Sequence, residues 1–181
     1  MTWMFGIRSW ALLLAVGVGT ACGSEAGEGS GAAAQPEAFA DHECGACGMI
    51  VREQPAPRAQ VVHRDGTHVW FCSIADVVAY LDAPSPHGRI EHVWVETLGA
   101  DAAAVDLGSS ERAAHPWLDA SDAFYVLGVA RPDVMGAPVL VFNTAAGAAA
   151  AATRFDARAA SWTEVLSTLG VASPAHAGHE H

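Results

Sequence analysis

Residues 59–81 read AQVVHRDGTHVWFCSIADVVAYL, and this stretch decides the fold. Its two strand-like segments, 59–64 and 67–72, are separated by Asp65-Gly66, a dipeptide typical of a tight β-hairpin turn. Ser73, which follows the second segment, is a favourable helix cap. Apolar side chains then recur at helical spacing, at Ile74, Val77, Val78 and Leu81. The stretch therefore predicts two antiparallel strands followed by a helix.

The chain beyond this stretch completes one unit and then repeats its order of elements. Pro84 and Pro86 end the helix, and RIEHVWV at 89–95 is typical of a third strand. Two further strands are expected at 123–128 (AFYVLG) and 137–142 (APVLVF), again followed by a helical segment. The second half therefore resembles the first in the sequence of strand, strand and helix.

Two helices are expected in the second half of the chain. Asn143 or Thr144 caps the first of them, which is rich in alanine, and Ser161 to Leu169 form the last. These elements predict an α+β protein made of two related ββαβ units, at residues 42–100 and 101–172. A single continuous domain is the alternative.

The first residues are typical of a secreted lipoprotein. Residues 1–21 combine one basic residue, a short apolar run and small residues, as in a signal peptide, and the run is too short to span a membrane. Cys22 follows these small residues and resembles the lipid-bearing cysteine of bacterial lipoproteins, with an ordinary signal peptide as the alternative. We therefore expect a lipid-anchored chain that faces the periplasm. Gly23 after the lipid cysteine favours the outer membrane.

Two segments are expected to remain unfolded. Residues 22–41 are small, acidic and without periodicity, which is typical of a flexible tether between lipid and folded domain. Residues 173–181 (SPAHAGHEH) form a His-rich tail that is expected to be disordered. Such a tail either collects metal ions weakly or has no role in binding.

Composition and motifs exclude several classes of function. The chain of 181 residues has 20 acidic and 9 basic residues, for a formal net charge of −11. Nucleic acid is therefore excluded as a partner, because its binding needs a basic surface. The order of residues contains no Ser-His-Asp arrangement for nucleophilic catalysis and no phosphate-binding loop.

The segment Cys44-Gly45-Ala46-Cys47-Gly48-Met49 carries the chemistry. It places two thiols and a thioether within six residues, and these soft donors favour Cu(I) over magnesium, calcium or manganese. Cys47 and Met49 are two residues apart, so in an extended strand both side chains would lie on one face and could bind one ion. Cys-x-x-Cys also occurs in zinc sites, structural disulfides and redox motifs, which stay open as alternatives.

Other residues are candidates for completing the site. Cys44 is either a further ligand or the disulfide partner of Cys47 in the metal-free protein, in which case reduction would have to precede metal loading. His42 lies two residues before Cys44 and could supply a nitrogen ligand. Cys72, at the junction of strand and helix, is expected to be a buried core thiol.

A collinear set of motifs over roughly residues 42–155 resembles the NosL family. The motifs are Cys-x-x-Cys-Gly-Met at 44–49, Pro57-Arg58-Ala59-Gln60-Val61, Trp70-Phe71, Val78-Ala79-Tyr80-Leu81, Trp117-Leu118-Asp119-Ala120, Ala123-Phe124-Tyr125-Val126 and Met135-Gly136-Ala137-Pro138. The resemblance implies a fold of two related ββαβ units and a periplasmic Cu(I)-binding lipoprotein that helps to metallate nitrous oxide reductase. It places the family's ligands on Cys47 and Met49, and makes Met135 a third ligand or a core residue.

Three hypotheses follow for the function. The first is a Cu(I) carrier without catalytic activity, whose partner is nitrous oxide reductase or its assembly transporter. The second is a copper or zinc buffer or sensor without a dedicated client, which could use the same site. The third is a thiol-dependent enzyme related to organomercurial lyases, whose fold NosL domains partly resemble. Its thiol and acid groups would be Cys44, Cys47 and Asp41.

Overall fold

The computed structural model describes residues 35–38, 40–55, 57–99, 115–130 and 136–170. The predicted signal peptide, Cys22, most of the expected tether, Met135 and the His-rich tail lie outside these residues. Within the described part of the chain, no helix is both long enough and apolar enough to cross a membrane.

The first unit follows the predicted order of strand, strand, helix and strand. β1 (Ala59–His63) and β2 (His68–Phe71) pair antiparallel on either side of the Asp65-Gly66 turn. α2 (Ile74–Asp82) comes next, and β3 (Ile90–Glu96) returns antiparallel to β1. The predicted hairpin, helix and third strand are confirmed. The spacing of apolar residues explains why these segments form strands and a helix. β1 becomes an inner strand and is buried along its whole length.

The second unit repeats this order. β5 (Phe124–Leu127) and β6 (Val139–Phe142) pair antiparallel, and α3 (Ala145–Arg154) follows them. β7 (Arg158–Ala160) then pairs with the other edge of β5 and leads into α4 (Trp162–Leu169). The structure therefore confirms an α+β fold in which strand, strand, helix and strand occur twice.

The helix caps decide where the two helices of the second unit begin. Thr144 rather than Asn143 caps α3, because its side chain accepts a hydrogen bond from the backbone N–H of Gly147. Ser161 caps α4 and forms a capping box with Glu164. Side-chain oxygens thus satisfy N–H groups that have no partner within the helix.

Two short strands are missing from the sequence prediction. β4 (Trp117–Asp119) pairs with β3, so the first sheet has the order β2-β1-β3-β4. A segment that the sequence assigns to the second unit thus completes the first sheet. β7 is the second omission, and it makes the order of the other sheet β6-β5-β7. Each of these strands has three residues, too few for an alternating pattern to be recognised.

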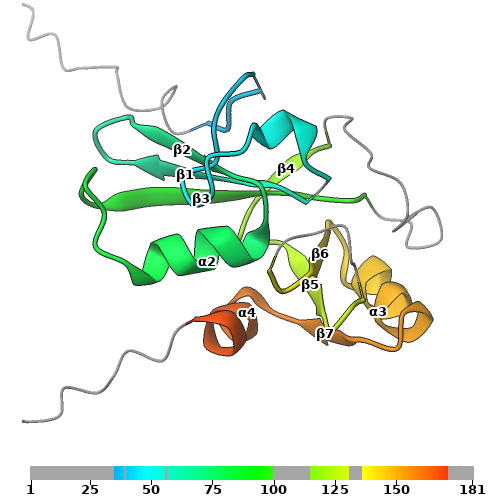
Figure 1. Ribbon diagram of the computed structural model, residues 1–181. Coiled ribbons are helices and arrows are strands. Elements are labelled where there is room, and N and C mark those ends of the chain that lie inside the picture. Colours follow the sequence, from blue (N-terminus) through cyan, green and yellow to red (C-terminus); the bar gives the residue numbers. More distant parts are fainter. Residues whose placement is uncertain (1–34, 39, 56, 100–114, 131–135, 171–181) are drawn as a thin grey trace, which may run out of the picture.

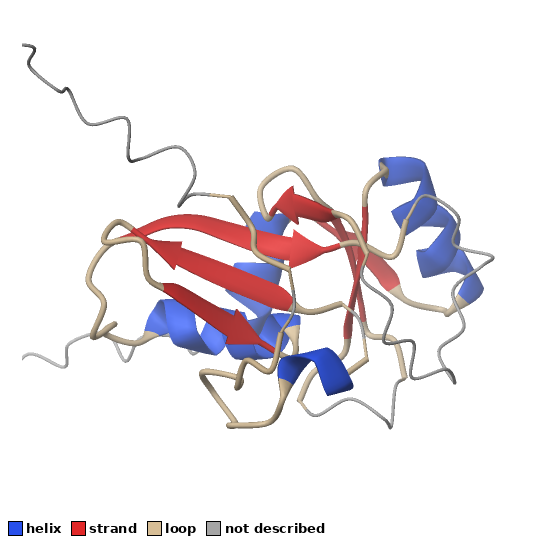
Figure 2. Cartoon of the chain, turned by 90° about the horizontal axis from the view of Figure 1, so that it is seen from above, coloured by secondary structure: helices blue, strands red, loops and turns tan. Residues whose placement is uncertain are grey.

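One hydrophobic core extends across both units. α2 covers one face of the first sheet and contacts α4 of the second unit (Figure 1), while Figure 2 shows the strands of the first sheet side by side with helices on their far side. Tyr125 and Leu127 of β5 belong to this shared core, whereas Val126 packs into a second cluster beneath α3. Alternate residues of β5 are therefore buried on opposite faces. The two units therefore repeat the same order of elements and also share one hydrophobic core.

A buried ion pair joins the segment after the cysteine motif to β3. Arg58 and Glu96 are both fully buried, with Nε–Oε2 and Nη2–Oε1 distances of 2.7 and 2.5 Å. The backbone N–H groups of Arg58 and His115 donate to the same carboxylate. Each carboxylate oxygen thus accepts two hydrogen bonds. The pair holds together the segment that enters β1, the end of β3 and the chain that leads to β4.

Candidate metal centre

The cysteine motif forms a tight turn. The N–H of Cys44 donates to the carbonyl of Met49 at 2.8 Å, and the N–H of Gly48 donates to the carbonyl of Cys44 at 2.9 Å. Gly48 has a φ of 73°, in the left-handed region that glycine adopts without steric cost. The expectation of an extended strand from Cys47 to Met49 is therefore wrong, because the backbone reverses direction between Cys44 and Met49.

The turn is attached to the end of β2. The N–H of Gly45 donates to the carbonyl of Trp70 at 2.8 Å, and Cys44 forms a bridge with the same residue. A Cβ atom at position 45 would lie 2.6 Å from Cγ1 of Val69, closer than two carbon atoms can approach. Glycine at position 45 thus permits the contact that brings Cys44 and Cys47 beside Cys72.

The first turn of α2 supplies a thiol and a carboxylate. Cys72 directly follows β2, and Ser73 caps the helix by accepting a hydrogen bond from the N–H of Asp76. The carboxylate of Asp76 turns back and accepts from Ser73 Oγ at 2.8 Å and from Cys72 Sγ at 3.2 Å. The capping geometry therefore directs this carboxylate toward the sulfur.

The turn and the helix together form a cluster of three thiols and one carboxylate. One ligand atom from each of Cys44, Cys47, Cys72 and Asp76 lies within 4.8 Å of every other. The sulfur atoms of Cys47 and Cys72 are 3.3 Å apart, and Cys44 Sγ is 4.0 Å from Asp76 Oδ2. Cys44 and Cys72 are buried, Asp76 is half-buried and Cys47 is exposed. Such a set can bind one soft metal ion that is reached through Cys47.

The thiols of the cluster differ in protonation. A hydrogen bond from the Cys72 thiol, supported by the backbone N–H groups of Cys72, Ala46 and Cys47, lowers the pKa of Cys44 to about 5, although burial opposes this shift. The pKa of Cys72 is raised far above its ordinary value, because its proton is shared with Cys44 and the sulfur is buried. At neutral pH the pair therefore holds a thiolate on Cys44 and a proton on Cys72.

This arrangement predicts a thiolate at mildly acidic pH. In the reduced chain with Cys22→Ser, we expect the ultraviolet absorbance of thiolate to rise by one equivalent near pH 5. Because the pKa of Cys44 is depressed from 9.0, the native state gains stability as the pH rises from about 5 to 9, and that gain is lost as the pH falls through about 5.

Two variants test the cause of the shift. Cys72→Ala removes the strongest hydrogen bond to Cys44, so the absorbance step should move toward the ordinary thiol pKa. Cys47→Ala keeps the backbone N–H groups and the Cys72 thiol, so the step should stay near pH 5. A step that remains near pH 5 in Cys72→Ala would show that another group stabilises the thiolate.

The candidate ligands from the sequence lie in different surroundings. Cys44 and Cys47 lie in the cluster, and Met49 is half-buried against the hydrophobic core, with its carbonyl bound to the N–H of Cys44. The imidazole of His42 instead stacks on Trp70, with ring centroids 3.6 Å apart and planes inclined by 4°. Met135 lies outside the described residues.

Sequence reasoning missed two members of the cluster. Cys72 is buried, as expected of a core thiol, but its sulfur contacts Cys47 and Asp76 rather than apolar side chains alone. The carboxylate of the cluster comes from Asp76, whereas Asp41 forms an exposed ion pair with Arg52 at 2.8 Å. The signal that could have identified both residues is a thiol just before a helix cap, with an acid in the first helical turn.

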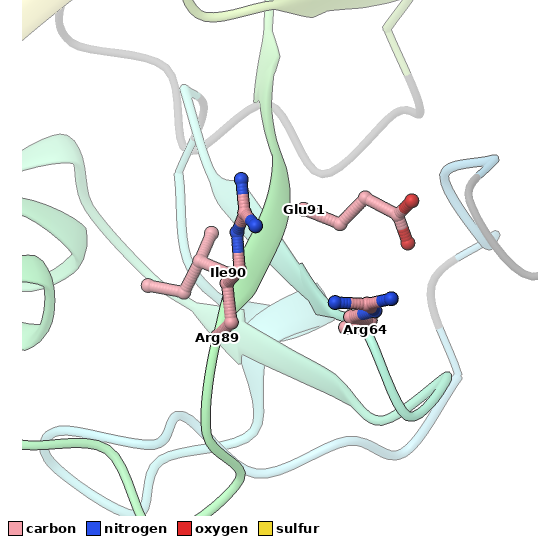
Figure 3. Close-up of a pocket in the computed structure, with 4 residues that line it drawn as sticks. All are labelled: Arg64, Arg89, Ile90 and Glu91. Atoms are coloured by element: carbon pink, nitrogen blue, oxygen red, sulfur yellow. The ribbon is translucent and has the colours of Figure 1, made fainter.

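A separate hollow lies at the opposite end of α2. It has a volume of about 420 Å³ and is lined by Arg64, Arg89, Ile90 and Glu91 (Figure 3). The backbone N–H of Arg64 donates to the carbonyl of Arg89. The end of the β1–β2 hairpin and the start of β3 therefore form the wall of the hollow. None of the four described residues that line it is a cysteine, and the metal centre is therefore distinct from this hollow.

Comparisons with known proteins agree with the fold and the motif. Residues 36–169 match the family model NosL. The copper-binding lipoprotein NosL of Stutzerimonas stutzeri is 31% identical over 176 residues, which cover 94% of this chain and 87% of that protein. The protein of the same name from Achromobacter cycloclastes is 33% identical over 96 residues, covering 52% and 48% of the two chains.

A solved structure shares the architecture. The crystal structure of the copper chaperone NosL from Shewanella denitrificans superposes with a TM-score of 0.58 and covers 72% of this chain and 95% of its own. The sequence identity is 23%, so this likeness concerns the fold.

Proposed function

The chain belongs to the NosL family, and from this premise we propose that it is a lipid-anchored, periplasm-facing carrier of Cu(I). The observation that carries the proposal is the cluster of Cys44, Cys47, Cys72 and Asp76 around one position. Cu(I) prefers soft thiolate and thioether ligands, and three sulfur atoms converge here. The relatives in Stutzerimonas and Achromobacter are named copper-binding lipoproteins, which supports copper as the cargo.

The three thiols have different roles in this proposal. Cys44 provides a thiolate that exists before the metal arrives, and Cys72 loses its proton when the metal binds. Cys47 is the exposed ligand, so an incoming acceptor can reach the ion from its side. Asp76 is a hard oxygen donor that suits Cu(I) poorly. We therefore assign it to hydrogen bonding with Cys72 rather than to copper.

Met49, Met135 and His42 remain proposed further ligands. Met49 follows the cysteine turn directly and matches the family's ligand in the Cys-Gly-Met motif. Met135 is proposed from the same resemblance. His42 would have to leave its stacked position on Trp70 before its nitrogen could bind the ion. A site with two or three ligands in use at a time would release copper by stepwise ligand exchange, whereas a closed set of four would retain it.

We further propose where the carrier acts and what receives its copper. Lipid on Cys22 and the tether at 22–41 would hold the domain near the membrane, with the outer membrane favoured. Nitrous oxide reductase or its assembly transporter is the proposed acceptor. A buffer or sensor would bind copper equally well but would not load such an acceptor. Transfer from the copper-loaded chain to apo nitrous oxide reductase therefore distinguishes the carrier from a buffer.

The decisive test is a titration of the reduced Cys22→Ser chain with Cu(I) against a competing chelator. We expect one tightly bound ion per chain, loss of tight binding in Cys47→Ser and weaker binding in Met49→Leu, because both changes remove sulfur donors. His92→Ala is the matched control, since this imidazole lies by Asp119 on the first sheet. Unchanged affinity in Cys47→Ser would contradict the assignment of the site.

One observation bears on the enzymatic alternative. A lyase would need paired thiolates and an acid in one pocket, and the cluster contains thiols beside the Asp76 carboxylate. The relatives are named as copper-binding proteins and a copper chaperone, which favours a carrier without catalysis. Incubation of the reduced chain with an organomercurial separates the two functions, because release of the hydrocarbon would reveal cleavage of the carbon–mercury bond. We expect binding without release.

A further inference from the structure

The thiols of Cys47 and Cys72 are in direct contact. The sulfur atoms of Cys47 and Cys72 lie 3.3 Å apart, although the residues are 25 positions apart in sequence. A disulfide bond measures about 2.05 Å, so the atoms need to approach by about 1.3 Å. Cys47 belongs to a surface turn next to Gly48, and glycine, which has no side chain, leaves the backbone there free to adjust. The contact therefore lies close to bonding geometry.

We propose that Cys47 and Cys72 form a reversible disulfide when the protein holds no copper, and that this bond closes the metal site. Its role as a gate rests on the proposed function as a Cu(I) carrier, whereas the pairing itself rests on the geometry. The Cys-x-x-Cys spacing instead suggests a bond between Cys44 and Cys47. The structure favours a different partner for Cys47.

The exposure of Cys47 and its contact with Cys72 together favour a bond between these two residues. Cys47 is the exposed thiol of the cluster, whereas Cys44 is only 4% exposed and Cys72 only 7%. A disulfide oxidant in the periplasm therefore reaches Cys47 first. The mixed disulfide on Cys47 is then resolved by the thiol in contact with it, which belongs to Cys72. Cys44 is left as a single buried thiol.

The chemistry is a balanced two-electron exchange with a low-molecular-weight disulfide. The Cys47 thiol gives its proton to the solvent and its thiolate attacks one sulfur of the oxidant, the S–S bond of the oxidant breaks, and the first thiolate leaves and takes up a proton. The Cys72 thiol gives its proton to the solvent by way of the Asp76 carboxylate that accepts its hydrogen bond, and its sulfur attacks Cys47 Sγ, which expels the second thiolate, and this thiolate takes up a proton. The oxidant is thus reduced to two thiols, and the protein loses two electrons and two protons.

Closure removes two of the three sulfur donors from the site. Only Cys44 keeps a free thiol, and a single thiol with a thioether such as that of Met49 binds Cu(I) less tightly than three thiols do. We expect the affinity for Cu(I) to fall by about 100-fold or more, beyond the 10–100-fold effect typical of residues that only orient a ligand. Bound copper should in turn protect Cys47 from oxidation, because its thiolate is then engaged.

The test treats the full chain carrying Cys22→Ser with oxidised glutathione, with and without prior loading by Cu(I). Peptide mapping under non-reducing conditions should recover Cys47 joined to Cys72, and Cys44 should be alkylated after unfolding. The copper-loaded sample should remain reduced. Recovery of Cys44 joined to Cys47, or of no bond at all, would overturn the proposed pairing.

Two variants sharpen the assignment. Cys44→Ala should still form the bond, since it leaves the contacting pair intact. Cys72→Ala should instead accumulate a stable glutathione adduct on Cys47, because its resolving thiol is absent. An adduct that resolves in Cys72→Ala through Cys44 would show that the cluster has no preferred partner and would overturn the inference.

A parallel Cu(I) titration separates this inference from the proposed function. Weak binding by the reduced chain would refute the carrier function whatever the disulfide pairing. Tight binding by both the reduced and the oxidised chain would leave the carrier function standing and overturn the gate. Tight binding by the reduced chain alone is the expected result.

Discussion

Cys72→Ser should lower the affinity of the reduced chain for Cu(I) by about 100-fold or more, because a hard hydroxyl replaces a soft sulfur donor. Serine is close in size to cysteine and can still donate a hydrogen bond to Asp76, so the start of α2 should remain folded. The measurement is a competition titration with a Cu(I) chelator in the Cys22→Ser chain. Circular dichroism of the same sample reports whether the fold is intact.

This variant discriminates between two roles of Cys72. A core thiol with no metal would leave Cu(I) affinity unchanged when replaced by serine, at most costing some stability. Ser73→Ala provides a control at the same helix end, since it removes the cap while keeping all three sulfur atoms. It should destabilise the fold by about 1 kcal/mol and have much less effect on copper binding. Equal losses of affinity in both variants would point to a purely structural effect.

Glu96→Gln should reduce the free energy of unfolding by about 3–5 kcal/mol, the cost of breaking a buried ion pair. The substitution removes the negative charge that faces the fully buried Arg58 guanidinium. Each oxygen of this carboxylate also accepts a hydrogen bond from one backbone N–H, and the amide NH2 group of glutamine cannot accept in place of either. Urea denaturation of the reduced, metal-free chain, followed by tryptophan fluorescence, measures the change.

Asp41→Asn is the matched control for this prediction. Asp41 also pairs with an arginine, Arg52, but the two side chains are 72% and 52% exposed. Loss of such an exposed pair should change stability by less than about 1 kcal/mol. If both variants lost the same amount, burial would not be what makes the Arg58–Glu96 pair important.

The sequence predicts the elements of the fold well where the signals are local. The Asp65-Gly66 turn, the Ser73 cap and the Ser161 cap all act within about four residues of the chain, and each is found in the structure. The short strands β4 and β7 escaped prediction because they owe their existence to partners in β3 and β5. Pairing across a sheet, rather than local preference, makes them strands.

The candidate site likewise has features that neighbouring residues predict and features that depend on distant segments. The motif at 44–49 identifies soft donors for copper from their chemistry alone, and family resemblance adds Met49 as a proposed ligand. The position of that motif beside Cys72 depends on the bond between the Gly45 N–H and the carbonyl of Trp70, which belongs to a distant segment. The sequence assigns Cys72 to the core, because Cys47, the thiol that it contacts, is distant in sequence.

By itself, the sequence determined the order of strands and helices and the soft chemistry of the site, because hydrophobic periodicity, helix caps and ligand type are properties of neighbouring residues. Only the tertiary structure decided which thiols meet. Cys47 and Cys72 come together because the end of β2 hydrogen-bonds the cysteine turn, and Asp76 joins them because the cap of α2 directs its carboxylate backward. The contact between Cys47 and Cys72 depends on how distant segments pack, and no local pattern encodes it.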